Sequence, residues 1–160
     1  MIGLWDKHHT VGVRPFGEAQ TYTLAADWLR GHGLVEDWGC GAGYARQFFE
    51  DYRGVDGSGT FADLQCDLSS YTSSAPCILM RHVLEHNFGW RKILDNMLSS
   101  FTERAVVVNF QNLEADESVR CWEGDIPYIG LPRDDFMRRI QPLLADSIVC
   151  GDETCFLLKK

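Results

Sequence analysis

The sequence predicts one α/β domain built on an open, doubly wound and mostly parallel sheet that closes with an antiparallel hairpin. Short apolar runs alternate with amphipathic segments of helical period along the 160-residue chain, the pattern of a sheet covered by helices on both faces. The last two apolar runs are separated by Gly151 and Asp152, which is typical of a hairpin turn. No repeat, low-complexity tract or linker interrupts the chain, so residues 1–160 are expected to form a single domain.

The expected helices are placed by apolar side chains that recur at three- and four-residue spacing. In chain order they cover residues 18–30, 42–51, 90–101 and 134–144. Gly31 and Gly33 end the first helix, and Asp134 is expected to cap the last one.

The expected strands are short apolar or β-branched runs. In chain order they cover residues 34–37, 52–56, 61–67, 77–80, 105–110, 147–150 and 154–158. The run 77–80 is the most apolar and should lie at the centre of the sheet, where both faces are covered.

One connection is too short for the usual pattern. Parallel neighbours need a crossover of about a dozen residues or more, whereas residues 57–60 alone join the second and third strands. Either a loop replaces the crossover helix or strand 61–67 is short and peripheral. We therefore expect a trimmed version of the fold.

The net charge of −8 gives the chain no general attraction to nucleic acid or other polyanions. Arg133, Arg138 and Arg139 could form a local basic patch, but their helical spacing favours a solvated face.

The cysteine pattern predicts free thiols. The chain has six cysteines but lacks the paired short spacings of zinc sites. Neither a secretory leader nor a run of about 20 apolar residues is recognisable, so a reduced, cytoplasmic protein without a membrane span is expected. Four cysteines fall in predicted strands, where a thiol packs as a small hydrophobe: Cys66, Cys77, Cys150 and Cys155.

A glycine-rich loop follows the first strand and carries Gly39, Gly41 and Gly43. Such a loop before a helix presents backbone N–H groups to a ligand. Its spacing is one residue shorter than the dinucleotide fingerprint, and Tyr44 stands where a phosphate-binding loop needs lysine. Asp37, two residues before the first glycine, would repel a pyrophosphate and suits a cationic ligand.

These residues resemble the first motif of the class I S-adenosylmethionine-dependent methyltransferases, which runs acidic-x-Gly-x-Gly-x-Gly. Residues 52–58 resemble the second motif, and residues 81–87 resemble the "VLEH" segment of small-molecule methyltransferases. The likeness covers about residues 35–110 and implies a Rossmann-like fold, S-adenosylmethionine as cofactor and S-adenosylhomocysteine as product. The cofactor-binding residues that it implies are Asp37, Gly39, Cys40, Gly41, Gly43, Asp56, Gly57, Asp67, Leu68 and Arg81.

The resemblance also implies roles for three carboxylates. Asp37 would receive the ammonium group of the cofactor directly or through water, and Asp56 would accept hydrogen bonds from the ribose hydroxyls. Asp67 would take the exocyclic amine of adenine, although Asp63 competes for this role if the third strand ends early.

Methyl transfer needs approach geometry, and a base where the acceptor must lose a proton. His82 follows the fourth strand directly and is the expected general base, with a hydrogen-bonded histidine of the pocket wall as the alternative. Glu85 and His86 are interpreted as structural. His8 and His9 lie in an aromatic, polar stretch, and they either close over the substrate or are solvated.

Two segments are expected to complete the site. Residues 1–16 are predicted to act as a lid, and residues 111–133 form an insertion that lines the acceptor site. The insertion contains Trp122, Pro127 and Tyr128, a composition that fits a sugar, a metabolite or a peptide side chain.

The expected reaction transfers a methyl group to oxygen or nitrogen of a small-molecule, glycan or peptide acceptor. Nucleic acid is not expected, because the Pro-Pro run of amino-methylating DNA enzymes is missing after residue 80 and the net charge is negative. The alternatives are a cofactor-binding protein without transferase activity, as a sensor or inactive partner subunit, and a nucleotide-binding oxidoreductase. The sequence leaves the oligomeric state open.

Overall fold

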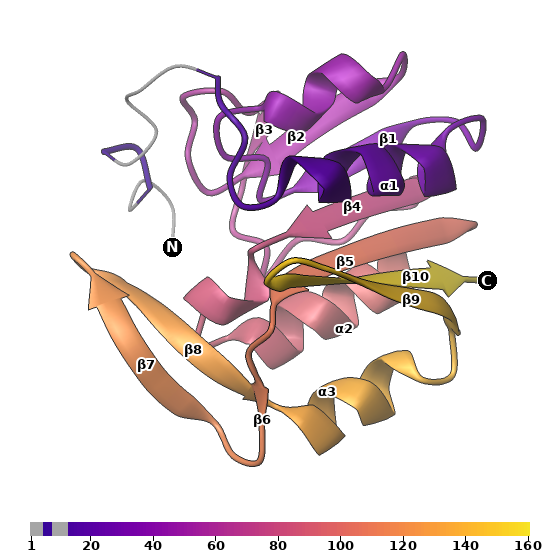
Figure 1. Cartoon of the computed structure of the whole chain (residues 1–160). Helices are drawn as coiled ribbons and strands as arrows, with labels where there is room; N and C mark the ends of the chain where they lie inside the picture. Colours follow the sequence, from indigo (N-terminus) through magenta and orange to yellow (C-terminus); the bar gives the residue numbers. More distant parts are fainter. Residues whose placement is uncertain (1–4, 8–12) are drawn as a thin grey trace.

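The structure, a computed structural model, describes residues 5–7 and 13–160. Its main sheet has seven strands in the order β3-β2-β1-β4-β5-β10-β9 (Figure 1). Strands β1 to β5 pair in parallel, whereas β10 runs antiparallel to both β5 and β9. The predicted mostly parallel sheet with a closing hairpin is therefore confirmed. The strands are β1 Val35–Trp38, β2 Tyr52–Asp56, β3 Leu64–Gln65, β4 Cys77–Arg81, β5 Arg104–Phe110, β9 Leu144–Cys150 and β10 Glu153–Lys159.

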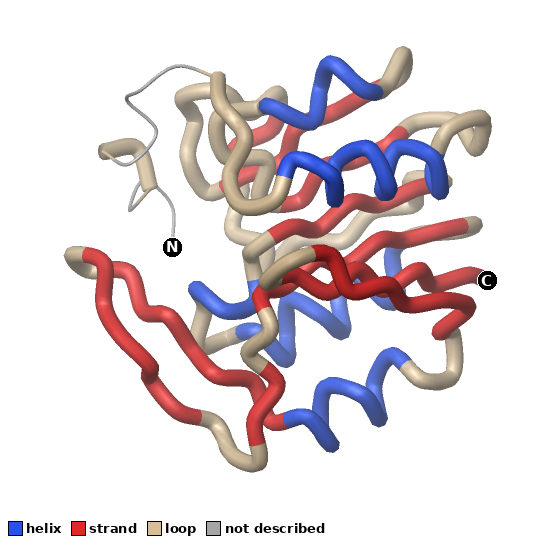
Figure 2. The backbone as a smooth tube through the Cα atoms, viewed as in Figure 1, coloured by secondary structure: helices blue, strands red, loops and turns tan. Residues whose placement is uncertain are grey.

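Helices cover both faces of this sheet (Figure 2). α1 (Ala19–Leu29) and the 3₁₀ helix η1 (Tyr44–Phe48) pack on one face. α2 (Trp90–Ser100) and α3 (Arg133–Ile140) pack on the other face. A second 3₁₀ helix, η2 (Leu84–His86), follows β4 at the edge of the sheet where the parallel strands end.

The residues of β4 separate the two cores. Ile78 and Met80 pack with α2 and α3, whereas Cys77 and Leu79 pack with α1. All four side chains are buried, which explains why this strand is continuously apolar rather than alternating. Its predicted central position is confirmed.

The helix expected over residues 42–51 is wrong in kind and in length, because η1 is one short 3₁₀ segment. The glycine loop occupies the start of the β1–β2 connection, and Phe49 is already extended, with φ of −129°. Few residues therefore remain to lead the chain from the glycine loop back to the start of β2 at Tyr52. A 3₁₀ helix rises about 2.0 Å per residue against about 1.5 Å in an α-helix, so it spans this distance with fewer residues.

The strand expected over residues 61–67 is reduced to β3, a two-residue strand at the edge of the sheet. Residues 57–63, all of which the structure describes, form a loop in place of the crossover helix. Both alternatives for this connection are therefore correct, because a loop replaces the helix and the third strand is short and peripheral. The carboxylate of Asp63 accepts hydrogen bonds from the Gly54 N–H at 2.7 Å and from Arg46 at 2.6 Å. These bonds hold Asp63 just before β3, which begins at Leu64.

The last helix also differs from the prediction. Asp134 lies in the first turn of α3, and Pro132 occupies the N-cap position. The helix ends at Ile140, and Leu144 already pairs with Leu158 of β10. Pairing with a distant strand therefore overrides the helical spacing of the sequence at this point.

The insertion over residues 111–133 contains a second sheet that the sequence analysis missed. β7 (Ser118–Glu123) and β8 (Ile126–Pro132) form an antiparallel hairpin, and β6 (Leu113–Glu114) pairs in parallel with β8. The turn is Gly124–Asp125, and Gly124 has a φ of 60°. A two-residue Gly–Asp turn is a recognised hairpin signal that could have located these strands. In Figure 1 the hairpin projects toward the side to which the arrow of β4 points.

The cysteines and the arginine cluster follow the predictions with one exception. All six cysteines, each within the described part of the chain, are free thiols, but Cys66 lies just after β3 rather than in a strand. Arg138 and Arg139 both pair with Asp135, and Arg139 also pairs with Asp95, so these two arginines belong to surface ion pairs. Among the described residues, none of the helices combines the length and apolar character needed to cross a bilayer.

Candidate functional site

A pocket opens at the carboxyl edge of the sheet, and we call it the main pocket. The loops after β1, β2, β3 and β4 form its floor, and Arg14, Pro15 and Phe16 contribute from the N-terminal segment. This is the edge at which open α/β sheets bind ligands. The predicted site residues that line it are Asp37, Gly39, Cys40, Gly41, Asp56, Gly57, Asp67, Leu68, Arg81 and His82.

The three glycines of the loop after β1 have different structural roles. Gly39 has a φ of 78°, and a Cβ atom there would lie 2.2 Å from Cγ2 of Val83. Gly41 has a φ of 53° and lines the main pocket. Gly43 stands apart from the pocket, because its N–H closes a turn onto the Cys40 carbonyl at 2.8 Å and its left-handed backbone caps η1. Two glycines therefore form the pocket floor, and the third shapes the loop.

Asp56 joins the two loops that flank the pocket. One carboxylate oxygen accepts a hydrogen bond from the Gly41 N–H at 2.9 Å, and the other accepts one from the Ser58 N–H at 2.7 Å. Each carboxylate oxygen has a second lone pair, so hydroxyl groups of a ligand can still donate to Asp56.

Asp37 is a buried acid that faces the main pocket. It is 4% exposed and accepts a hydrogen bond from the Tyr52 hydroxyl at 2.7 Å. Burial raises the pKa of Asp37 to about 6, against the opposing effect of the Tyr52 hydrogen bond. A cation in the pocket would stabilise the ionised carboxylate, so the site is suited to a positively charged ligand group.

The structure distinguishes the two candidates after β2. Asp67 and Leu68 line the main pocket, whereas Asp63 is held on the outer side of β2 by Arg46 and the backbone of Gly54. The pocket therefore favours Asp67 over Asp63 as the residue near a ligand base.

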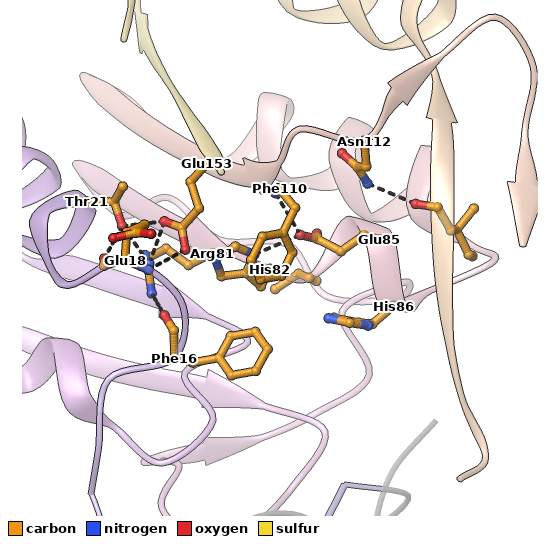
Figure 3. A network of polar contacts seen from close by, with 12 residues as sticks. Phe16, Glu18, Thr21, Arg81, His82, Glu85, His86, Phe110, Asn112 and Glu153 are labelled. Carbon is orange, nitrogen blue, oxygen red and sulfur yellow. Dashed lines mark hydrogen bonds and ion pairs between the residues drawn. The ribbon is translucent and has the colours of Figure 1, made fainter. Parts of the chain in front are cut away.

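Behind the pocket lies a buried ionic network centred on Glu153, which Figure 3 shows with its partners. Glu153 is fully buried and accepts hydrogen bonds from Thr21 Oγ1 at 2.6 Å, Arg81 at 3.0 Å and His82 Nε2 at 2.8 Å. It also accepts the backbone N–H of Glu18 at 2.7 Å. The network thus ties α1, the end of β4 and the start of β10 together.

His82 is held between two acids. Its Nδ1 lies 2.8 Å from Glu85 and its Nε2 lies 2.8 Å from Glu153. Burial alone would lower the pKa of His82, but the two hydrogen bonds raise it above its usual value. An ionised carboxylate can only accept a hydrogen bond, so each ring nitrogen donates to its acid and no lone pair remains to take a proton from a substrate. This arrangement gives no support to His82 as general base and favours the alternative of a pocket-wall histidine.

Arg81 is positioned by the same network. Its guanidinium lies 3.5 Å from the ring centroid of Tyr22 and donates to the Phe16 carbonyl at 3.1 Å. Arg81 therefore anchors the N-terminal segment over the pocket, in addition to lining it.

The residues that the sequence analysis missed come from distant parts of the chain. Glu153, Tyr22 and Phe16 were not predicted, and Glu153 is separated from His82 by 71 positions. One signal was present: a glutamate that begins an apolar strand must be paired if the strand is buried. His8 and His9 lie outside the described residues, and the described part of the chain contains no cluster of His, Cys, Asp and Glu suited to a metal ion.

Comparison with known proteins identifies the fold. No protein-family model matches the sequence, and no curated protein matches it significantly. Magnesium protoporphyrin IX methyltransferase from Synechocystis, solved with bound S-adenosylhomocysteine, is similar at a TM-score of 0.68 and 15% identity, over 98% of this chain and 92% of that chain. A putative S-adenosylmethionine-dependent methyltransferase from Listeria monocytogenes is similar at a TM-score of 0.64 and 11% identity, over 89% and 99%. The mitomycin 7-O-methyltransferase MmcR is similar at 0.61 and 16%, over 88% of this chain and 55% of that chain.

These similarities extend over 88–98% of this chain. The chain therefore has the class I S-adenosylmethionine-dependent methyltransferase fold. At these identities the likeness concerns the fold, so the function has to be argued from the site.

Proposed function

We propose that the chain is a methyltransferase that binds S-adenosylmethionine in the main pocket and methylates oxygen or nitrogen of a small-molecule or glycan acceptor. The observation that carries this proposal is the buried carboxylate of Asp37 beside the bare backbone of Gly39 and Gly41. A phosphate ligand would be repelled there. An ammonium group, or a sulfonium close to it, would be stabilised.

The other lining residues fit the same cofactor. Asp56 has lone pairs left for ribose hydroxyls, and Asp67 and Leu68 lie together where a base can be held. The bound cofactor supplies an activated methyl group and a neutral thioether leaving group. The protein contributes binding, orientation and the exclusion of water.

The two predicted flanking segments support the proposal. The ring of Trp5 contacts His86 at 5.6 Å between centroids, and Asp6 accepts a hydrogen bond from the Ser58 hydroxyl at 2.7 Å. Lys7 pairs with Asp125 at the tip of the β7–β8 hairpin. We infer that residues 5–7 belong to a lid that bridges the loop after β2 and the insertion, and that the insertion forms the acceptor side. Residues 1–4 and 8–12 of the predicted lid lie outside the described part of the chain.

The experiment that tests this function is a ligand-dependent melting scan. S-adenosylmethionine and S-adenosylhomocysteine at about 100 times their dissociation constants should each stabilise the chain by about 2.7 kcal/mol. NADH and ATP are the controls. A shift with NADH or ATP and none with the sulfonium cofactor would refute the proposal. Binding with no transfer to any acceptor would favour the sensor or inactive subunit.

The Asp56→Ala variant locates the ligand in the pocket. It should weaken S-adenosylmethionine, because the loss of a hydrogen bond to a charged acceptor costs about 1.5–3 kcal/mol. The 2′-deoxy analogue should be affected less. An equal loss for both ligands would show that Asp56 does not contact that hydroxyl.

A further inference from the structure

A second cavity adjoins the main pocket, and its walls are aromatic. Four of the side chains that line this open cavity carry aromatic rings: Phe16, His86, Phe110 and Tyr128. These rings contact one another, with centroid distances of 5.9 Å for Phe16–Phe110, 5.8 Å for Phe110–Tyr128, 6.0 Å for Tyr128–His86 and 6.4 Å for His86–Phe16. An acceptor would therefore pack against this group of rings. We call this second cavity the aromatic cavity.

The two pockets meet at three residues. Phe16, His86 and Glu123 line both the main pocket and the aromatic cavity. A molecule in the aromatic cavity would therefore adjoin the cofactor across these side chains. Glu123 is the acidic group of this boundary, and it disfavours an acceptor that carries a carboxylate.

His86 has a defined protonation pattern. Its Nδ1 lies 3.0 Å from the Pro127 carbonyl oxygen, which can only accept a hydrogen bond, so Nδ1 carries the proton. In the neutral ring Nε2 then holds a free lone pair. This atom is buried, and it has no hydrogen-bond partner among the described residues. A buried, unpaired acceptor at the boundary of two pockets indicates a group that a ligand is meant to satisfy.

We propose that the aromatic cavity holds a planar, apolar acceptor with one hydroxyl group of phenolic type, and that His86 Nε2 accepts its proton. The inference rests on the proposed function. A sugar would leave most of its hydroxyl groups unpaired against four rings, whereas a flat ring packs against them and presents a single hydroxyl.

The step balances as follows. The hydroxyl O–H bond breaks and its proton goes to Nε2, which becomes an imidazolium. The oxygen forms a bond to the methyl carbon as the carbon–sulfur bond breaks, and that electron pair stays on sulfur. The positive charge of the sulfonium is thereby transferred to His86, and the proton is released to water afterwards.

The test compares two phenols that differ in ionisation. 4-Methylphenol is neutral at mildly alkaline pH and needs a base, whereas 4-nitrophenol is largely ionised and does not. In the His86→Gln variant, single-turnover methyl transfer to 4-methylphenol should fall about 10²–10⁴-fold. Transfer to 4-nitrophenol should fall less than about tenfold, because glutamine keeps polar contact but cannot take the proton. His32, which pairs with Glu103 at the surface, provides the matched control His32→Gln, and its rates should not change.

The other outcomes distinguish among the role of His86, the acceptor class and the proposed function. Equal losses on both phenols would overturn His86 as the proton acceptor. Transfer to D-glucose, or to neither phenol, while S-adenosylhomocysteine binds by calorimetry would overturn the acceptor class and leave the proposed function intact. Absence of cofactor binding by wild type would instead refute the proposed function. If His86→Gln loses cofactor binding, His86→Asn replaces it, because its amide can still donate to the Pro127 carbonyl.

Discussion

Replacing Glu153 with glutamine should destabilise the fold strongly, although the residue lies behind the pocket. Glu153 is fully buried and holds two cations, Arg81 and His82, whose side chains are 5% and 2% exposed. The variant Glu153→Gln keeps the shape but leaves Arg81 without its ion pair and His82 with Glu85 as its one acidic partner among the described residues. Removal of one partner of a buried pair costs about 3–5 kcal/mol.

The pKa of Glu153 gives a second, independent value for the free energy that the network contributes. Burial alone would raise it, but hydrogen bonding and charge from His82, with Thr21 and Arg81, lower it from 4.5 to about 2. A change of this size corresponds to about 3 kcal/mol. Because the folded pKa lies below the unfolded one, this stability is present above pH 4.5 and is lost as the pH falls toward about 2.

His82 determines the upper limit of the pH range in which the network stabilises the fold. Its pKa is raised above 6.5 in the folded chain, so its contribution is complete below pH 6.5 and is lost as the pH rises through the folded value. The difference in unfolding free energy between wild type and Glu153→Gln should therefore be largest between pH 4.5 and 6.5.

Urea unfolding followed by tryptophan fluorescence measures this difference across the pH range. Glu103→Gln is the control, because the Glu103–His32 pair is half exposed and should contribute less than about 1 kcal/mol. A cost for Glu153→Gln below about 1 kcal/mol, or one that is independent of pH, would refute the role given to this network.

Two further predictions concern the main pocket. The affinity for S-adenosylmethionine should rise with pH through about 6, because a cation binds the ionised form of Asp37, and Asp37→Asn should flatten this dependence. Calorimetry from acid to neutral pH measures it, and an unchanged wild-type affinity would contradict the assignment. Gly39→Ala should lower both thermal stability and cofactor affinity, because its Cβ would lie 2.2 Å from Val83 at a φ of 78°. The double variant Gly39→Ala with Val83→Ala should recover part of the loss; if it recovers none, the clash is not the cause.

The sequence predicted which strand ends and loops line the main pocket wherever this depends on neighbouring residues. Asp37, Gly39 and Asp56 are placed by a strand end and the loop that follows it, and both features can be read within a few positions of each other. For the same reason the missing helix after β2 was expected from the length of the connection. The spacing of residues in the sequence predicts a contact where the two partners lie within a few positions of each other.

The parts that were not predicted depend on contacts between distant segments. Sequence reasoning about His82 did not include Glu153, which pairs with its Nε2. Sequence reasoning about His86 did not include the Pro127 carbonyl, 41 positions away, which pairs with its Nδ1. The early end of α3 has the same origin, since β10 recruits Leu144 into a strand. In each case the partner lies too far away in the sequence for local spacing to reveal the contact.

The position of β10 has a consequence for the order in which the protein takes shape during synthesis. β10 is the last of the strands to leave the ribosome, yet it lies between β5 and β9 rather than at an edge of the sheet. Until it emerges, β5 presents an unpaired apolar edge that includes Val106, Val107 and Val108, a hazard for association with other nascent chains. Glu153 arrives with the same strand, so Arg81 gains its buried ion pair, and His82 its second acid, only when the sheet closes. The network behind the main pocket is therefore completed by the same event that closes the sheet.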